Sequence, residues 1–152
     1  MKLIDTDETV LIVTGSDLPA EMNDRPLSYA LKAEIDQRAA GRPWRGAVVV
    51  SDRWYAENRL FHLCATIAVG GPGVNGVTAS WADELPMLVQ RDERVFVQGA
   101  WAEDGEPQRA ALWGMDRVTT AQAVEVFVRE GHLAAFLARA WPGVAAPRSD
   151  LV

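Results

Sequence analysis

Three short apolar runs recur along the chain, and each of them ends in a polar or glycine-rich turn. They occupy residues 10–13, 47–50 and 64–69. Runs of this length that are bounded by turn residues predict buried strands. Because apolar residues are nearly continuous in them, we expect both faces of each strand to be covered, as in a parallel sheet.

Helical patterns lie between and after these runs. An apolar stripe with a spacing of four residues runs from Leu27 to Ile35 and predicts a helix. Pro26 favours the start of this helix, with Asn23 or Asp24 as the expected cap.

Further helices are expected later in the chain. Two short ones should cover residues 53–60 and 75–85. Near the C-terminus, Thr119 should open another helix, because Gln122 follows it in capping-box spacing. A last helical segment is expected over residues 132–141.

Two further apolar segments, residues 95–101 and 109–113, predict a β-hairpin whose turn covers residues 103–106. Trp101 and Trp113 flank this turn symmetrically, so we expect them to form a cross-strand pair. Alternating strands and helices are typical of parallel βαβ units. The sequence thus predicts a Rossmann-like α/β fold, a three-layer sandwich around a sheet of about five mostly parallel strands with an antiparallel hairpin strand. Residues 1–141 should form one domain and residues 142–152 a flexible tail.

Composition narrows the function classes. The 152 residues include 49% hydrophobic and 24% charged side chains, which is the balance of a globular protein. Acidic residues outnumber basic ones by 21 to 15, for a net charge of −6, and this argues against a nucleic-acid partner. Cys64 is the single cysteine, so no intrachain disulfide can form.

The expected location is the cytoplasm. The N-terminus has neither the basic nor the apolar region of a signal peptide, and no apolar run approaches the length of a membrane helix. The six tryptophans are expected in the core or at a subunit interface, which makes a homo-oligomer, most simply a homodimer, the expected assembly.

Polar and glycine-rich segments follow the predicted strands. In open parallel sheets, ligands bind beyond the carboxyl ends of the strands. This edge therefore holds the candidate ligand-binding residues: Ser16, Asp17, Gly70, Gly71, Gly73, Asn75 and Asp116.

The segment Gly70-Gly71-Pro72-Gly73 is the sharpest local feature, because it places backbone N–H groups beside a predicted helix N-terminus. Such a place attracts a phosphate or a carboxylate, and Asn75 is suited to bind a ligand hydroxyl. The alternative is a tight turn in which Asn75 caps the helix. The segment lacks the Gly-Lys-Ser/Thr of a Walker loop, and its match to a dinucleotide fingerprint falls on the third strand.

A second cluster follows the strand of residues 47–50. Asp52 and Glu57 are candidate catalytic carboxylates, and Trp54 or Tyr55 is placed to stack on a ring. The alternative is structural: Asp52 caps a short helix, and Glu57 pairs with Arg53 one turn away.

Few residues of this chain are candidates for binding a metal ion or for acting as a nucleophilic thiol. The two histidines and Cys64 have no metal-ligand spacing, and we assign no metal or other cofactor. A Mg²⁺ site formed by Asp17, Asp52 and Asp116 is an alternative. Cys64 is expected to be a buried structural thiol; the alternative is a nucleophile activated by His62.

One local resemblance bears on the fold. Residues 67–75 read Ile-Ala-Val-Gly-Gly-Pro-Gly-Val-Asn, and residues 110–114 read Ala-Ala-Leu-Trp-Gly, with Thr119, Thr120 and Ala123 after them. This order resembles the C-terminal α/β module of archaeal surface-layer-type proteins over less than half of the chain. The resemblance implies a structural or binding role without known catalysis.

Three functions therefore stand as hypotheses. The first is a small-ligand-binding domain for an anionic or nucleoside-like molecule at the strand ends. The second is a hydrolase or glycosyl-transfer enzyme on the same edge. The third is a non-catalytic structural or oligomerisation module.

Overall fold

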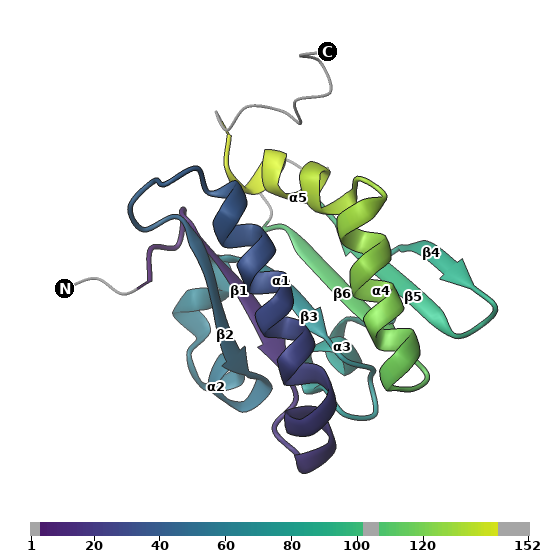
Figure 1. The fold of residues 1–152 in the computed structure, drawn as a ribbon. Helices are drawn as coiled ribbons and strands as arrows, with labels where there is room; N and C mark the ends of the chain where they lie inside the picture. The colour runs from purple at the N-terminus through teal and green to yellow at the C-terminus, as the bar shows by residue number, and fades with distance from the viewer. Residues whose placement is uncertain (1–3, 102–106, 143–152) are drawn as a thin grey trace.

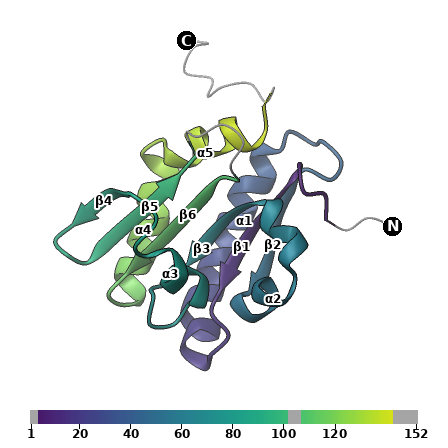
Figure 2. The ribbon, with the colours of Figure 1, turned by 180° about the vertical axis from the view of Figure 1, so that it is seen from behind.

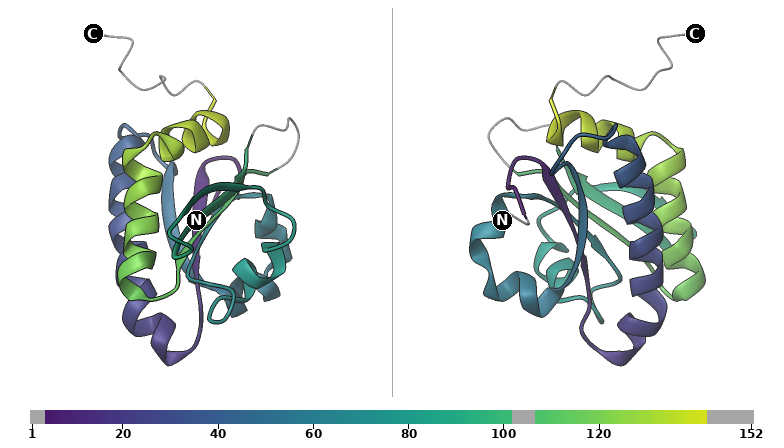
Figure 3. Two further views of the ribbon diagram at one scale, coloured as in Figure 1. Left: turned by 90° about the vertical axis from the view of Figure 1, so that its right-hand side faces the viewer. Right: turned by 60° about the vertical axis from the view of Figure 1, so that its left-hand side comes forward.

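A six-stranded mixed sheet forms the centre of the molecule, with helices on both of its faces (Figure 1, Figure 3). The computed structural model describes residues 4–101 and 107–142. The strands are β1 Thr9–Thr14, β2 Gly46–Ser51, β3 Ala65–Val69, β4 Met87–Arg91, β5 Val95–Ala100 and β6 Arg109–Gly114. The α-helices are α1 Arg25–Arg38, α2 Asp52–Glu57, α3 Gly76–Trp81, α4 Arg117–Arg129 and α5 His132–Ala140. A π-helical turn, η1 Ala20–Asp24, precedes α1, and a 3-10 helix, η2 Arg59–Leu63, follows α2.

The strand order is β2-β1-β3-β6-β5-β4. Strands β1, β2, β3 and β6 are parallel, whereas β5 runs antiparallel to both of its neighbours. The expected α/β fold with its antiparallel hairpin strand is confirmed. The turn predicted over residues 103–106 and the tail after residue 142 lie outside the described residues.

Alternation along the strands divides the core between two helical layers. Val10 and Ile12 of β1 point to the face covered by α1, α4 and α5, and Leu11 and Val13 point to the opposite face. Helices α2 and α3 cover that opposite face (Figure 2). All six residues of β1 are buried. The continuous apolar run thus reflects a strand that is covered on both faces, as expected of a central parallel strand.

The sheet has six strands, whereas the sequence predicted about five. The strand that the prediction lacks is β4. This strand lies at the edge of the sheet, and four of its five side chains are exposed. Its pairing with β5 also contains a register shift between Met87 and Val89. An exposed edge strand buries no regular apolar face, and so it leaves little periodic signal in the sequence.

Two helix starts differ from the prediction. The side chain of Asp24 makes no capping bond, because the π-helical turn runs directly into α1 and the Arg25 N–H donates to the Ala20 carbonyl. The helix expected to open at Thr119 begins at Arg117 instead. There Asp116 is the N-cap and forms the capping box with Thr119, so Gln122 has no part in it.

The expected pair of Trp101 and Trp113 is wrong. The hairpin register places Phe96 opposite Trp113, and these two rings stack with centroids 4.1 Å apart. Trp101 instead packs edge-on against Phe127 and Phe136, on the face covered by α4 and α5. Symmetry about the turn in sequence was misleading, because the two tryptophans belong to opposite faces of the sheet.

Candidate functional site

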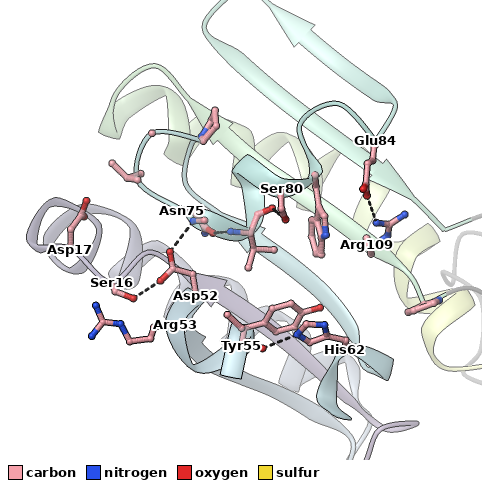
Figure 4. Close-up of a pocket in the computed structure, with 18 residues that line it drawn as sticks. Ser16, Asp17, Asp52, Arg53, Tyr55, His62, Asn75, Ser80, Glu84 and Arg109 are labelled. Carbon is pink, nitrogen blue, oxygen red and sulfur yellow. Dashed lines mark hydrogen bonds and ion pairs between the residues drawn. The ribbon is translucent and has the colours of Figure 1, made fainter. Parts of the chain in front are cut away.

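A cleft of about 1080 Å³ opens on the α2 and α3 side of the sheet and extends to the carboxyl ends of β1 and β2 (Figure 4). Four of the predicted ligand-binding residues line it, namely Ser16, Asp17, Gly73 and Asn75, and so does the predicted catalytic residue Asp52. These residues were predicted to meet because they follow the carboxyl ends of parallel strands, and in the structure they line one cleft. Arg53 and Tyr55 of α2 also line it. More distant segments supply His62, Ser80, Trp81, Glu84 and Arg109.

Asp52 connects three parts of the chain at the polar end of this cleft. Its carboxylate accepts a hydrogen bond from the Ser16 hydroxyl and another from the Gly76 N–H, at 2.8 Å for the latter. It does not cap α2, because Ser51 does so by accepting a bond from the Trp54 N–H. Asp52 thus joins the end of β1 to the first turn of α3.

Asn75 is buried beneath the glycine-rich turn and is 1% exposed. Its amide nitrogen donates to the carbonyl oxygens of Val13 and Val69, and its side-chain oxygen accepts from the N–H groups of Val77 and Thr78. The alternative of a helix cap is the one that the structure shows. Both amide hydrogens are engaged with the backbone, so none remains for a ligand hydroxyl.

The glycine-rich turn has a specific backbone shape. Gly70 continues the ladder by donating to the Leu112 carbonyl and has a φ of 115°, a conformation that glycine adopts readily. The Gly71 carbonyl accepts from the N–H groups of Val74 and Asn75. The first N–H groups of α3 are bound to Asp52 and Asn75. The chain's own carboxylate and amide therefore occupy the first N–H groups of α3, and the Gly70 N–H is used by the sheet.

Aromatic side chains form the middle of the cleft. Tyr55 is buried and stacks on His62, with ring centroids 4.0 Å apart, and the His62 Nε2 contacts the Tyr55 carbonyl oxygen at 2.7 Å. Burial raises the pKa of the Tyr55 hydroxyl. Trp81, on α3, is also buried, and the Arg109 guanidinium lies over its ring, 5.6 Å from the ring centre.

The charges of the cleft are unevenly placed. At one end Arg109 forms an ion pair with Glu84 at 2.9 Å. At the other end Arg53 is exposed beside Ser16 and Asp52 (Figure 4), and within the described ranges no carboxylate pairs with it. Asp17 lies nearby and accepts a hydrogen bond from the Ala20 N–H. Arg53 is therefore the cation of this cleft that is available to a ligand.

Four predicted residues do not line this cleft, namely Gly70, Gly71, Glu57 and Asp116. Glu57 is exposed and does not line the cleft, and among the described residues its expected ion pair with Arg53 is not formed. Asp116 caps α4 and borders a different cavity, which it shares with Gly71 and Gly73. Hydrogen bonds from Thr119 hold the pKa of Asp116 below its usual value.

Cys64 has the structural role that was expected. It is fully buried, and this burial raises the pKa of its thiol to about 11. His62 belongs to η2 rather than to a strand, and its ring is engaged with Tyr55. The alternative of a nucleophile activated by His62 therefore finds no support. Within residues 4–101 and 107–142, no group of three carboxylate, histidine or cysteine side chains is placed to hold a metal ion.

Sequence reasoning missed Trp81, Ser80, Glu84 and Arg109 as lining residues. They reach the cleft because α3 folds back over the sheet and β6 pairs with β3. Neither contact can be predicted from a pattern within one segment of the sequence. Tyr55 was named for ring stacking, and it does line the cleft. The adjacent Trp54 instead packs against Phe61, with ring centroids 5.4 Å apart.

Comparisons with protein-family models and with curated proteins found no match to this chain. The resemblance to the surface-layer module therefore stays a prediction from the residues that carry it. None of the helices in the described part of the chain combines the length and the apolar character that a membrane span requires.

Proposed function

We propose that the protein binds a small anionic, nucleoside-like ligand in the cleft between α2 and α3. The observation that carries this proposal is the meeting of three chemistries in one cleft: Tyr55 and Trp81 in its middle, Ser16 and Asp52 at the strand ends, and the unpaired Arg53 beside them. Ligand sites typically combine an apolar, aromatic lining with a few convergent polar groups.

Each part of the ligand has a matching part of the cleft. A planar ring fits the aromatic stretch at Tyr55 and Trp81, where stacking and apolar burial both contribute. Hydroxyl groups fit the carboxylate of Asp52, which retains lone pairs beyond the two hydrogen bonds that it accepts. A phosphate or carboxylate group fits the guanidinium of Arg53, which offers paired donors to such an anion.

The test is a binding measurement on the full chain with nucleotides, nucleosides and sugar phosphates, by thermal shift and then by calorimetry. A nucleotide at about 100 times its Kd adds roughly 2.7 kcal/mol to the free energy of unfolding. Arg53→Gln should weaken binding of the nucleotide at least tenfold and leave binding of the uncharged nucleoside nearly unchanged.

The matched control is Arg42→Gln. Arg42 is an exposed arginine that does not line the cleft, so its replacement changes the net charge by the same amount. It should leave the Kd unchanged. Equal losses in both variants would mean that binding follows net charge and would refute the site. No binding of any of these compounds at millimolar concentration would refute the function.

The enzyme hypothesis has less support. Of its two candidate bases, Glu57 lies outside the cleft, and the Asp52 carboxylate already accepts hydrogen bonds from Ser16 and Gly76. The homodimer stays a proposal in the same sense. Trp44 is 55% exposed and is the tryptophan that a subunit interface would most simply bury. Sedimentation equilibrium of the full chain, with and without Trp44→Ala, tests it; a monomer at all concentrations would refute it.

A further inference from the structure

A second, smaller cavity lies on the other side of the glycine-rich turn from the ligand cleft. Its volume is about 320 Å³, which suits a small molecule. Three segments form it: the π-helical turn η1 with the residue before it, the turn of residues 71–74, and the junction of β6 with α4. Its apolar lining includes Pro19, Pro72, Trp113 and Met115, and its deepest charged group is Asp24.

Asp24 is an unusual residue for such a position. It is 5% exposed, and among the described residues no group donates a hydrogen bond to its carboxylate. The side-chain hydrogen bond described at this residue is donated by the Ser28 hydroxyl to the Asp24 backbone carbonyl, not to the carboxylate. Most buried carboxylates in proteins are paired with a cation or accept several hydrogen bonds. Within the described part of the chain, Asp24 has neither.

The backbone around Asp24 leaves room for its carboxylate. A side-chain Cβ at Gly70 would lie 2.6 Å from the Asp24 Oδ2, so only glycine is accommodated there without a shift. The π-helical turn ends at Asp24 itself, and π-helical turns occur frequently at functional sites. Burial, together with the charge of Asp17, raises the pKa of Asp24 to about 6. The carboxylate is therefore ionised at neutral pH, but it has no partner within the described chain.

The cavity does not suit an anion. The helix α4 begins at its rim, but two of its first N–H groups are engaged by its own cap: Thr119 N donates to the Asp116 carboxylate and Thr120 N to the Asp116 carbonyl. Asp24 inside and Asp116 at the rim face the cavity, and Arg117 is the one cation of its described lining. Arg94 lies 4.0 Å from the Asp116 carboxylate, so within the described residues the Asp24 carboxylate is the charge of this cavity that lacks a partner.

We propose that this cavity is a binding site for a small aliphatic primary amine, whose ammonium group donates hydrogen bonds to the Asp24 carboxylate while its alkyl chain lies against Trp113. A buried carboxylate gains most from a charged donor, because hydrogen bonds between ionised groups are about twice as strong as neutral ones. Trp113 offers a fixed aromatic surface, since its ring stacks on Phe96 and its indole N–H donates to Gln98. This site is separate from the proposed nucleoside-like site and does not depend on it.

The test uses n-butylammonium chloride as the probe and the full chain at about pH 7.5, where Asp24 is ionised. Heteronuclear NMR should show saturable shifts of the Trp113 indole N–H and the Gly71 amide. Asp24→Asn should weaken this binding at least tenfold. The matched control is Asp17→Asn, which removes a neighbouring exposed carboxylate and retains the oxygen that accepts from the Ala20 N–H. Its Kd should stay within about threefold of the unmodified chain.

A second measurement does not depend on a variant. Because the ammonium group binds only the ionised form of Asp24, saturation with the amine should lower the pKa of Asp24, as followed by the ¹³C shift of its carboxyl group. Three results would overturn the proposal. They are no saturable binding up to about 50 mM amine, equal weakening by Asp17→Asn and Asp24→Asn, and equal affinity for n-butanol, which would show an apolar cavity without a role for the charge.

Discussion

The Asp52 carboxylate accepts a hydrogen bond from the Gly76 N–H at 2.8 Å, so a side chain from the first residue of α2 closes the first turn of α3. The same carboxylate holds the Ser16 hydroxyl at the end of β1. Three loops at the carboxyl edge of the sheet are thereby joined at one residue. These hydrogen bonds form the polar end of the ligand cleft and hold the end of β1 against the start of α3.

Replacement of Asp52 should therefore cost stability as well as binding. We expect Asp52→Ala to lower the free energy of unfolding by about 1–2 kcal/mol, because the Gly76 N–H and the Ser16 hydroxyl both lose their acceptor. Asp52→Asn should cost less, since its amide oxygen still accepts one of the two bonds. Urea denaturation provides the measurement. Glu57→Ala, on the same short helix but exposed, serves as the control and should change stability by less than about 0.5 kcal/mol.

The burial of Asp24 predicts a dependence of stability on pH. Its pKa in the folded protein is raised from 3.8 to about 6, so the folded state binds this proton more tightly than the unfolded chain does. Stability from this group is fully present below about pH 4 and is lost as the pH rises through about 6. The loss is on the order of 1–3 kcal/mol.

Asp24→Asn isolates that contribution from other titrating groups. The variant should be more stable than the unmodified chain at pH 7.5, and the difference between the two should shrink at pH 4, where Asp24 is protonated. Denaturant unfolding at both pH values measures this difference. A difference that does not change with pH would contradict the assignment of the raised pKa to Asp24.

Replacement by alanine should affect the stability of the fold very differently at two glycines of the same edge. A Cβ at Gly15 would lie 1.9 Å from the Val74 carbonyl oxygen, so the end of β1 and the glycine-rich turn would have to separate. We expect Gly15→Ala to destabilise the fold by about 1–3 kcal/mol. A Cβ at Gly73 meets nothing within 4 Å, so Gly73→Ala should leave the melting temperature nearly unchanged. A larger loss at Gly73 than at Gly15 would contradict the described packing of the turn.

Cys64 should be chemically inert in the folded protein. A pKa of about 11, against an ordinary value of 9.0, leaves about a hundredfold less thiolate at pH 8. Burial of the sulfur slows its reaction further. The rate of reaction with an aromatic disulfide reagent should therefore be at least a hundredfold lower in buffer than in denaturant. A fast reaction in buffer would show that the strand containing residues 65–69 opens readily.

The strand ends were predictable because they depend on local pattern. Apolar runs that stop at polar residues mark where buried strands end, and parallel strands bring those ends to one edge. Ser16, Asp52 and Gly73 were identified in this way, and the structure places them around one cleft. Asp116 follows a strand end as well, but the cavity that it borders lies on the opposite side of the glycine-rich turn.

What each polar side chain does was decided by tertiary structure. Asp52 has the local pattern of a helix cap, yet Ser51 takes that role, and the Asp52 carboxylate reaches the backbone of α3 instead. Asp24 has the pattern of a cap too, but the π-helical turn makes a side-chain cap unnecessary and leaves the carboxylate buried. Such outcomes depend on which loop packs over the residue, and spacing within one segment does not determine that.

By itself, the sequence determined the order and type of most elements of this protein, the burial of the central strands β1 and β3, and the edge at which its polar residues collect. These follow from the periodicity of apolar side chains, which is a local property. The same expectation of burial for β2 is wrong, because β2 lies at the edge of the sheet and is only partly buried. Only the tertiary structure decided the sixth strand, the aromatic stretch of Tyr55 and Trp81, and the burial of the Asp24 carboxylate without a partner among the described residues. These depend on contacts between residues far apart in the chain, where burial and the presence or absence of a partner set the chemistry of each group.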